Sequence, residues 1–276
     1  MTQEHESGDV GRPRVVVSVG MSVDGRVTLR RGHLLLEKDD AQAWQSTRTP
    51  SAAALESARQ SQLTSLYHSR VVLEGSGSLV TDSAGPLTGL PTEFDGPTDL
   101  LYDDFLPAEV LEREDHENWF TVVDSRGRVH WDNKGGSGGW DVLVLVARAT
   151  PAPYLAYLQR ERVSYLLVGD ERVDLALALR RLQDHFGVTC VVSKAGGGLN
   201  GALLRAGLVD EIHLLVDPTA VGGLGTPTLF DGPPLAEGER PTPLRLLSCH
   251  VESDGMLWLR YEVVRDSISR VRAYAT

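Results

Sequence analysis

The sequence predicts an α/β fold whose central sheet is mostly parallel and which ends in an antiparallel hairpin. From residue 141 onward, short apolar strands alternate with segments of helical periodicity, which is typical of right-handed βαβ units. Two strand-like segments near the end, 244–251 and 256–264, flank a hairpin turn at 253–255. The chain has 276 residues, 41% of them hydrophobic, which is enough apolar material for one large core.

The first elements of the predicted fold are a buried strand, a helix and a second strand. Residues 14–20 are rich in β-branched side chains and predict a strand that leads into a turn at 22–25. Apolar residues recur at roughly helical spacing over 51–67, directly after Pro50, which predicts a helix. We expect this helix to lead into a strand over 70–74.

The remaining elements follow a regular alternation of strands and helices. A strand is expected at 119–123 and a glycine-rich connection at 131–140. Segments of period 2 then alternate with segments of period 3.6. The expected strands are 141–147, 163–168, 188–193 and 209–216, and the expected helices are 151–162, 174–186 and 199–206.

An acidic insertion interrupts this pattern. We expect a single domain over 14–264, with the insertion at 83–118, a flexible leader at 1–13 and a tail at 265–276. The insertion is rich in Pro, Gly and acids, and predicts one short helix over 107–114. It holds ten acids and one base, so it contributes −9 of the net charge of −11. We expect it either to border the substrate mouth or a partner surface, or to be a solvated loop.

Two glycine clusters are candidate phosphate-binding loops. Gly75-Ser76-Gly77-Ser78 and Gly196-Gly197-Gly198 each follow a predicted strand. Backbone N–H groups at a helix N-terminus bind phosphate oxygens, and glycines keep side chains out of the way. Each cluster is equally consistent with a tight turn. Neither matches the GxGxxG fingerprint or a P-loop, which disfavours a Rossmann or NTPase protein.

Charge and composition exclude several classes of function. The net charge of −11 argues against nucleic acid or an anionic membrane as a partner. The sequence shows no signal peptide and no apolar run long enough for a membrane helix, so we expect a cytoplasmic protein. Its eight histidines are scattered and its two cysteines, Cys190 and Cys249, lie in apolar strands, so we expect packing cysteines and no metal.

Several segments together resemble a known enzyme family. The stretch from Ala195 to Gly232 is similar to the C-terminal signature of the riboflavin-biosynthesis reductases, the C-terminal domain of the bifunctional deaminase-reductase. The segments SVDGR at 22–26, VVLEGSGSLVTD at 71–82 and TVVDSRGRV at 121–129 also resemble this family. The resemblance implies a three-layer fold like that of dihydrofolate reductase.

The resemblance also implies a reaction, in which NADPH reduces the ribosylamino group of a pyrimidinone phosphate, and a homodimer. Asp82 and Asp24 would provide hydrogen bonds or a proton, although Asp24 also suits a plain turn. Ser22, Asp82 and Lys194 would contact the small-molecule substrate. Arg148 would meet the 2′-phosphate of NADPH, or be a solvated charge. The implied cofactor-binding residues are Gly75, Gly77, Ser78, Arg148, Gly169, Gly196, Gly197, Gly198 and Leu199.

The sequence departs from the family pattern at two positions that bear on the substrate. Lys194 stands where the family usually has glutamate, and Ser18 stands near a position where many relatives have lysine. If the two positions meet, a basic group has moved between strands and phosphate binding can survive; otherwise Lys194 faces solvent. The zinc deaminase signature H-x-E with P-C-x-x-C does not occur, so we expect a stand-alone reductase.

Three functions are therefore consistent with the sequence. The first is a reductase of riboflavin biosynthesis. The second is the same fold and cofactor acting on another imine, carbonyl or pterin-like substrate in specialised metabolism. The third is a catalytically silent nucleotide-binding protein.

Overall fold

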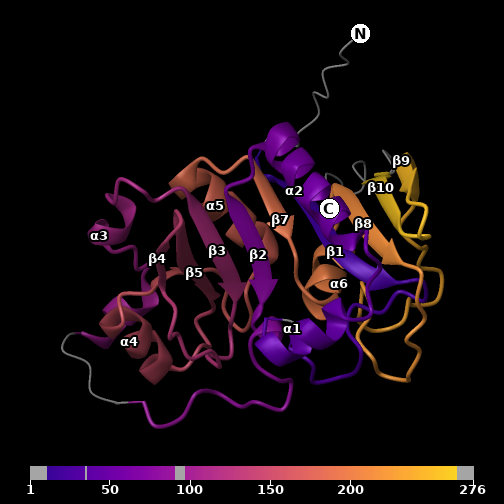
Figure 1. Cartoon of the computed structure of the whole chain (residues 1–276). Helices are drawn as coiled ribbons and strands as arrows, with labels where there is room; N and C mark the ends of the chain where they lie inside the picture. Colours follow the sequence, from indigo (N-terminus) through magenta and orange to yellow (C-terminus); the bar gives the residue numbers. More distant parts are fainter. Residues whose placement is uncertain (1–10, 35, 91–96, 266–276) are drawn as a thin grey trace.

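A mixed sheet of ten strands forms the centre of the part of the chain that the structure describes (Figure 1). The computed structural model describes residues 11–34, 36–90 and 97–265. Nearly all of the expected leader and tail lies outside these residues. Within them, no helix combines the length and the apolar character needed to cross a membrane.

The sheet is mostly parallel, as the sequence predicts. The strand order is β4-β5-β3-β2-β7-β1-β8-β10-β9, with β6 beside β5. Seven strands pair with one another in parallel, and they are β1 (Arg14–Ser22), β2 (Val71–Gly75), β3 (Asn118–Val123), β5 (Trp140–Val146), β6 (Ser164–Leu167), β7 (Cys190–Ser193) and β8 (Glu211–Asp217). The antiparallel additions are β4 (Gly135–Ser137), β9 (Leu244–Val251) and β10 (Leu257–Val263), and the last two form the expected C-terminal hairpin.

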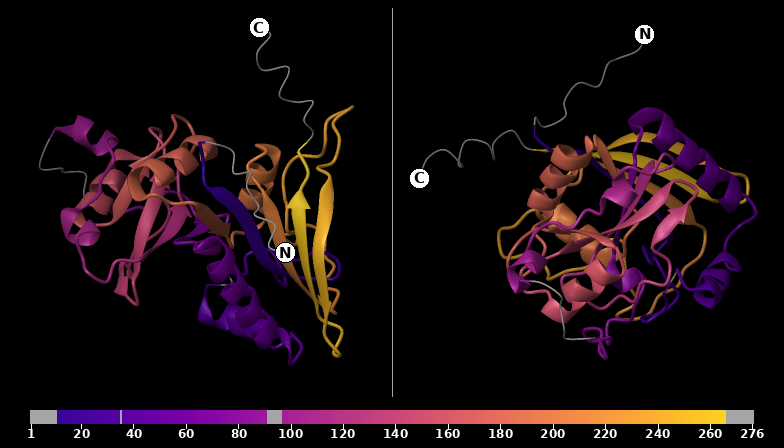
Figure 2. Two further views of the ribbon diagram at one scale, coloured as in Figure 1. Left: turned by 90° about the horizontal axis from the view of Figure 1, so that it is seen from above. Right: turned by 90° about the vertical axis from the view of Figure 1, so that its left-hand side faces the viewer.

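Helices cover both faces of the sheet and give three layers. The helices are α1 (Lys38–Gln45), α2 (Ala52–Tyr67), α3 (Ala108–Leu111), α4 (Ala152–Arg160), α5 (Leu175–Phe186) and α6 (Gly197–Arg205), and two short 3-10 helices are η1 (Ser76–Ser78) and η2 (Thr98–Tyr102). Because side chains alternate along a strand, one strand supplies both cores. In β5, Leu143 and Leu145 pack with α5 and α6, whereas Val142 and Val144 pack with α4. Figure 2 (left) shows α2 on one side of the sheet and α5 and α6 on the other.

Two short elements, α1 and β4, were not predicted from the sequence, and several predicted boundaries differ from those of the structure. Helix α1 buries only Trp44 and its eight residues are mostly polar, so the sequence offers no apolar stripe that would mark it as a helix. Strand β4 lies inside the glycine-rich connection and pairs with the start of β5. The helix expected at 107–114 is the single turn α3. In contrast, α5 has clear local signals, since Asp174 accepts the amide of Leu177 at 2.9 Å and Gly187 ends the helix at a φ of +62°.

The described part of the acidic insertion covers the edge of the sheet at β6. Phe105 forms a β-bridge with Tyr165, whose hydroxyl donates to the carbonyl of Leu101 at 2.8 Å. Asp104 accepts the amide of Leu167 at 2.8 Å and pairs with Arg181. These residues of the insertion are therefore part of the core rather than a solvated loop.

Candidate active site

The two glycine loops meet at the edge of the sheet where the parallel strands end. Gly75 closes β2, and α6 follows β7. A Cβ atom on Gly75 would lie 3.7 Å from Cβ of Leu199, so the loops touch. Ligands in open α/β sheets bind at this edge, and the structure brings the predicted Gly75, Gly77, Ser78 and Leu199 together there.

The N-terminus of α6 is open toward solvent and has free backbone donors. A Cβ on Gly196 or Gly198 would have no atom within 4 Å. Among the described residues, the amides of Gly197, Gly198 and Leu199 have no hydrogen-bond acceptor. A short helix N-terminus with open amides is suited to a phosphate group.

Two glycines of α6 have a packing role instead. A Cβ on Gly197 would collide with the carbonyl oxygen of Thr228, and one on Gly201 would collide with the carbonyl oxygen of Asp231. The segment around Thr228 is fixed locally, because the carboxylate of Asp231 accepts its hydroxyl at 2.6 Å. Gly197 is therefore needed for the close approach of this segment, whatever else its amide binds.

Asp24 is an acceptor that fixes a loop. Its carboxylate accepts the hydroxyl of Ser22 at 2.6 Å and the amides of Val221 and Gly222 at 3.0 and 2.7 Å. These hydrogen bonds hold the pKa of Asp24 well below its usual range. Asp24 therefore favours the carboxylate form, which suits a hydrogen-bond acceptor that positions the loop.

Asp82 and Arg148 lie at the surface of the same edge. The carboxylate of Asp82 is exposed and pairs with Arg31 at 3.1 Å. Arg148 is also exposed, with its guanidinium 5.6 Å from the ring of Tyr102 and 3.9 Å from Asp170. The predicted Gly169 accepts the amide of Arg148 through its carbonyl at 3.0 Å, and its φ of +104° requires glycine. Gly169 thus shapes the backbone beside Arg148.

A buried pair, Asp124 and Arg128, which was not predicted from the sequence, supports the first glycine loop. Arg128 donates to the hydroxyl of Ser76 at 2.7 Å and to the carbonyl of Thr81 at 3.1 Å. Asp124, at the end of β3, accepts the amide of Arg128 at 2.7 Å and the hydroxyl of Tyr154 at 3.1 Å. Both residues lie in the segment 121–129 that resembles the family, and that resemblance is the signal from which they could have been predicted.

The strand register places Ser18 and Lys194 at neighbouring positions, but Ser18 does not line the cavity that Lys194 lines, and its hydroxyl has no hydrogen-bond partner among the described residues. Val17 of β1 is opposite Ser193 of β7, so Ser18 and Lys194 follow as neighbours on one face. Glu74, which the sequence analysis also missed, is the neighbour of Lys194 on β2. Burial raises the pKa of Glu74 to about 7, although the hydroxyl of Ser78 and the charge of Lys194 oppose the shift. A glutamate in an otherwise apolar strand was the available signal.

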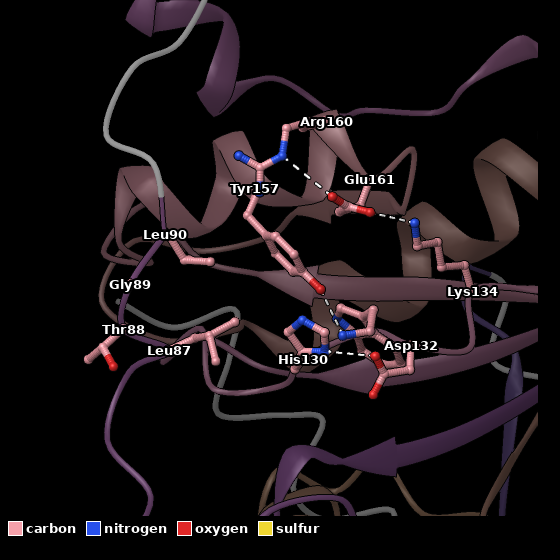
Figure 3. Close-up of a pocket in the computed structure, with 11 residues that line it drawn as sticks. Leu87, Thr88, Gly89, Leu90, His130, Asp132, Lys134, Tyr157, Arg160 and Glu161 are labelled. Atoms are coloured by element: carbon pink, nitrogen blue, oxygen red, sulfur yellow. Dashed lines mark hydrogen bonds and ion pairs between the residues drawn. The ribbon is translucent and has the colours of Figure 1, made fainter.

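A cavity of about 630 Å³ opens between α2 and this part of the sheet. Lys194 reaches it from the end of β7. Its lining residues are Gln45, Arg48, Ala53, Glu56, Ser57, Gln60, Ser61, Val72, Trp140 and Lys194. A separate hollow of about 420 Å³ lies between residues 87–90 and α4 (Figure 3). Its charged side chains pair with one another, as Glu161 does with Lys134 and Arg160, and the hydroxyl of Tyr157 accepts the amide of Trp131. The first cavity, which Lys194 lines, is the candidate substrate site.

Comparison with known proteins identifies the relatives of this chain. Residues 13–258 match the family model of the RibD C-terminal domain. A curated protein of Methanothermobacter thermautotrophicus, named 2,5-diamino-6-ribosylamino-4(3H)-pyrimidinone 5′-phosphate reductase, is 34% identical over 111 residues. A protein of the same name from Archaeoglobus fulgidus is 33% identical over 111 residues. Each match covers 40% of this chain and 50% of the relative.

Solved structures with low sequence identity share the fold. RibD of Acinetobacter baumannii aligns with a TM-score of 0.57 and 20% identity, covering 92% of this chain and 59% of that one. A pyrimidine reductase-like protein of Corynebacterium diphtheriae has the same TM-score and 16% identity, covering 92% and 93%. A riboflavin biosynthesis reductase of Saccharomyces cerevisiae has a TM-score of 0.54 and 15% identity, covering 94% and 93%. These structures confirm the predicted fold class.

Proposed function

Because the chain belongs to the RibD C-terminal domain family, we propose that it is an NADPH-dependent reductase of a ribosylamino-pyrimidinone phosphate. The observation that carries this proposal is the meeting of two glycine loops, with free amides, at the carboxyl edge of the sheet. The curated relatives bear the name of this reductase.

The residues at this edge fit a phosphorylated dinucleotide. The amides of Gly198 and Leu199 and the open backbone of Gly196 would hold a phosphate, and Gly75, Gly77 and Ser78 would approach the cofactor from β2. Arg148, exposed beside Gly169, would meet the 2′-phosphate that distinguishes NADPH from NADH. When bound, NADPH supplies the hydride.

The other residues of the site position loops and substrate. Arg128 holds Ser76 and so fixes the shape of the first glycine loop. Asp24 holds the backbone after β8, and Ser22 orients its carboxylate. Lys194 would contact the substrate in the cavity. Asp82, exposed beside Arg31, would offer a carboxylate to substrate hydroxyls at the mouth.

Lys194 also favours a second candidate function. An ammonium group in the candidate substrate cavity changes the polarity that the substrate meets. The same fold and cofactor would then reduce another imine, carbonyl or pterin-like compound.

We propose that the protein works as a homodimer in the cytoplasm. Strand β9 is the last strand of the sheet, and Leu246 and Val251 on it are 51% and 62% exposed. An exposed apolar edge strand is suited to pairing with a second copy. Cys190 and Cys249 are free thiols, which suits a reducing compartment. Sedimentation of Leu246→Lys beside the wild type tests the dimer, which the variant should weaken.

The proposed activity is tested by NADPH binding and by turnover. NADPH fluorescence should change on binding, and the absorbance of reduced nicotinamide should fall when the pyrimidinone phosphate is added. Binding without oxidation of this substrate would favour the second candidate function. A protein that binds no NADPH at all would refute both.

A further inference from the structure

A buried carboxyl and a lysine without an ion pair lie side by side where β2 and β7 end. Leu73 is opposite Ser193, so the next residues, Glu74 and Lys194, are neighbours on the same face of the sheet. The amide of Lys194 donates to the carbonyl of Leu73 at 3.1 Å, which fixes the two strand ends together. Glu74 is only 5% exposed.

The other charged groups on this face already have partners. From α2, Arg59 pairs with Glu56 at 2.6 Å. Arg48, which precedes α2, pairs with Asp217 at 3.2 Å. Arg128, from the loop after β3, is held by Ser76 and lies 3.9 Å from Asp124.

Glu74 and Lys194 are the groups on this face without such a partner. Among the described residues, neither has an ion pair within 4.0 Å. The hydroxyl of Ser78 donates to Glu74 at 2.7 Å and is its only side-chain partner in that part of the chain. Lys194 lines the cavity, whereas Glu74 is buried beside it. Lys194 is therefore the charged neighbour of Glu74 that reaches the cavity.

We propose that Lys194 and Glu74 form a proton-transfer couple, in which Lys194 gives a proton to the reduced substrate and Glu74 restores it. The proposal rests on the proposed function. Hydride addition to an imine carbon leaves the electron pair of the C=N bond on nitrogen. An N–H bond then forms there as an N–H bond of the Lys194 ammonium breaks. The Lys194 ammonium and the Glu74 carboxyl are more than 4.0 Å apart in the structure, so in this scheme the lysine side chain swings to hydrogen-bond distance of Glu74 for the second step. The O–H bond of Glu74 then breaks to recharge Lys194, and water later reprotonates the Glu74 carboxylate.

The direction of this transfer follows from ordinary acidities. A carboxylic acid is a stronger acid than an ammonium, so Glu74 transfers its proton to a neutral Lys194 spontaneously. Burial raises the pKa of Glu74 to about 7, so in a substantial fraction of the molecules Glu74 is protonated at neutral pH. Glu74 acts through Lys194 and is a positioning residue in this scheme.

A titration without cofactor or substrate tests the couple. Infrared or carbon NMR spectra should show one carboxyl group titrating near neutral pH, which Glu74→Gln removes. Lys194→Met should raise the midpoint by about one pH unit or more, since the ammonium favours the carboxylate. Lys38→Met, which removes an exposed lysine, is the matched control and should leave the midpoint unchanged. A Glu74 signal at an ordinary glutamate pH, or one that ignores Lys194→Met, would overturn the proposal.

The pH profile of turnover tests the transfer itself. The wild-type kcat should fall as the pH rises through about 7, since Glu74 must be protonated. Glu74→Gln should lower kcat about tenfold at pH 6 and remove this dependence. Glu109→Gln, on the exposed helix α3, should keep the wild-type profile. A wild-type profile in Glu74→Gln would exclude the couple. If neither the wild type nor any variant turns over the pyrimidinone phosphate, the proposed function is refuted. The titration without substrate still shows in that case whether Glu74 and Lys194 are coupled.

Discussion

The two faces of the sheet differ sharply in chemistry. The face covered by α5 and α6 is a nearly continuous apolar core, which includes Val17, Leu73 and Val191 of the central strands. On the opposite face, under α2, the same strands carry Ser18, Glu74 and the residue that follows β7, Lys194. The α5 face therefore supplies most of the apolar core, whereas the α2 face carries the titratable and polar groups to which the proposals above assign a role.

The difference shows why a polar face is tolerated in so central a place. Charges buried on the α2 face are paired or hydrogen-bonded, as in the group around Glu211, which His213 and Arg260 contact at 2.8 and 2.7 Å. Stability on this face is conditional on pH and on partners, whereas on the apolar face it is not.

The largest loss of stability is expected from creating a cavity in the apolar core on the α5 face. Leu182→Ala removes a fully buried side chain of α5 and should lower the free energy of unfolding by about 2–5 kcal/mol. Chemical denaturation measures this loss. Leu224→Ala, at a fully exposed leucine, is the control and should change little. Equal losses in both variants would contradict the assignment of the core.

A pH-dependent effect is expected on the polar face. The pKa of Glu74 is raised from 4.5 to about 7, so the folded state favours the protonated form and loses stability as the pH rises through this range. The glutamine of Glu74→Gln cannot ionise. As the pH rises from 4.5 to 8, the free energy of unfolding of this variant should therefore rise relative to that of the wild type by up to about 3 kcal/mol. Thermal unfolding at a series of pH values measures the gain. Parallel stability curves would show that Glu74 titrates normally.

A smaller effect should follow from loosening the first glycine loop. Arg128→Met removes the hydrogen bonds to Ser76 and Thr81 and should weaken NADPH binding about tenfold, which is about 1.4 kcal/mol. Fluorescence titration gives the Kd. Arg70→Met, which removes an exposed arginine at the opposite end of β2, serves as the control. Unchanged affinity in Arg128→Met would mean that the loop holds its shape without this arginine.

The smallest effect concerns the choice between cofactors. Arg148→Ala should weaken NADPH binding about fivefold, or about 1 kcal/mol, because an exposed charge is screened by solvent. NADH binding should not change. If both cofactors lose affinity equally, Arg148 does not contact the 2′-phosphate.

The order of the strands was largely predictable, because a βαβ pattern leaves few arrangements. The strands at 14–20 and 141–147 and the helix at 174–186 were found within one or two residues at each end, since their periodicity is strong. Helix α1 and strand β4 were not predictable, because α1 buries a single residue and β4 consists of residues 135–137. Tertiary contacts rather than local pattern stabilise both.

The candidate site was predictable only in part. Glycine loops were recognisable from their order along the chain, but the role of Gly197 depends on the distant Thr228. The adjacency of Ser18, Lys194 and Glu74 depends on strand register, which the sequence does not reveal. Asp82 was expected near the substrate, and its pairing with Arg31 at the surface depends on a loop whose path has no sequence signal.

The insertion that covers β6 also limits how copies of this chain can assemble. With Phe105 paired to Tyr165, the sheet offers β9 as its long free edge in the described part of the chain. Two open edges would allow copies to add end to end without limit, as in a fibre. One open edge allows a single self-complementary contact about a twofold axis, after which growth stops. In the proposed dimer, the acidic insertion would therefore stop further strand addition at the end of the sheet opposite β9.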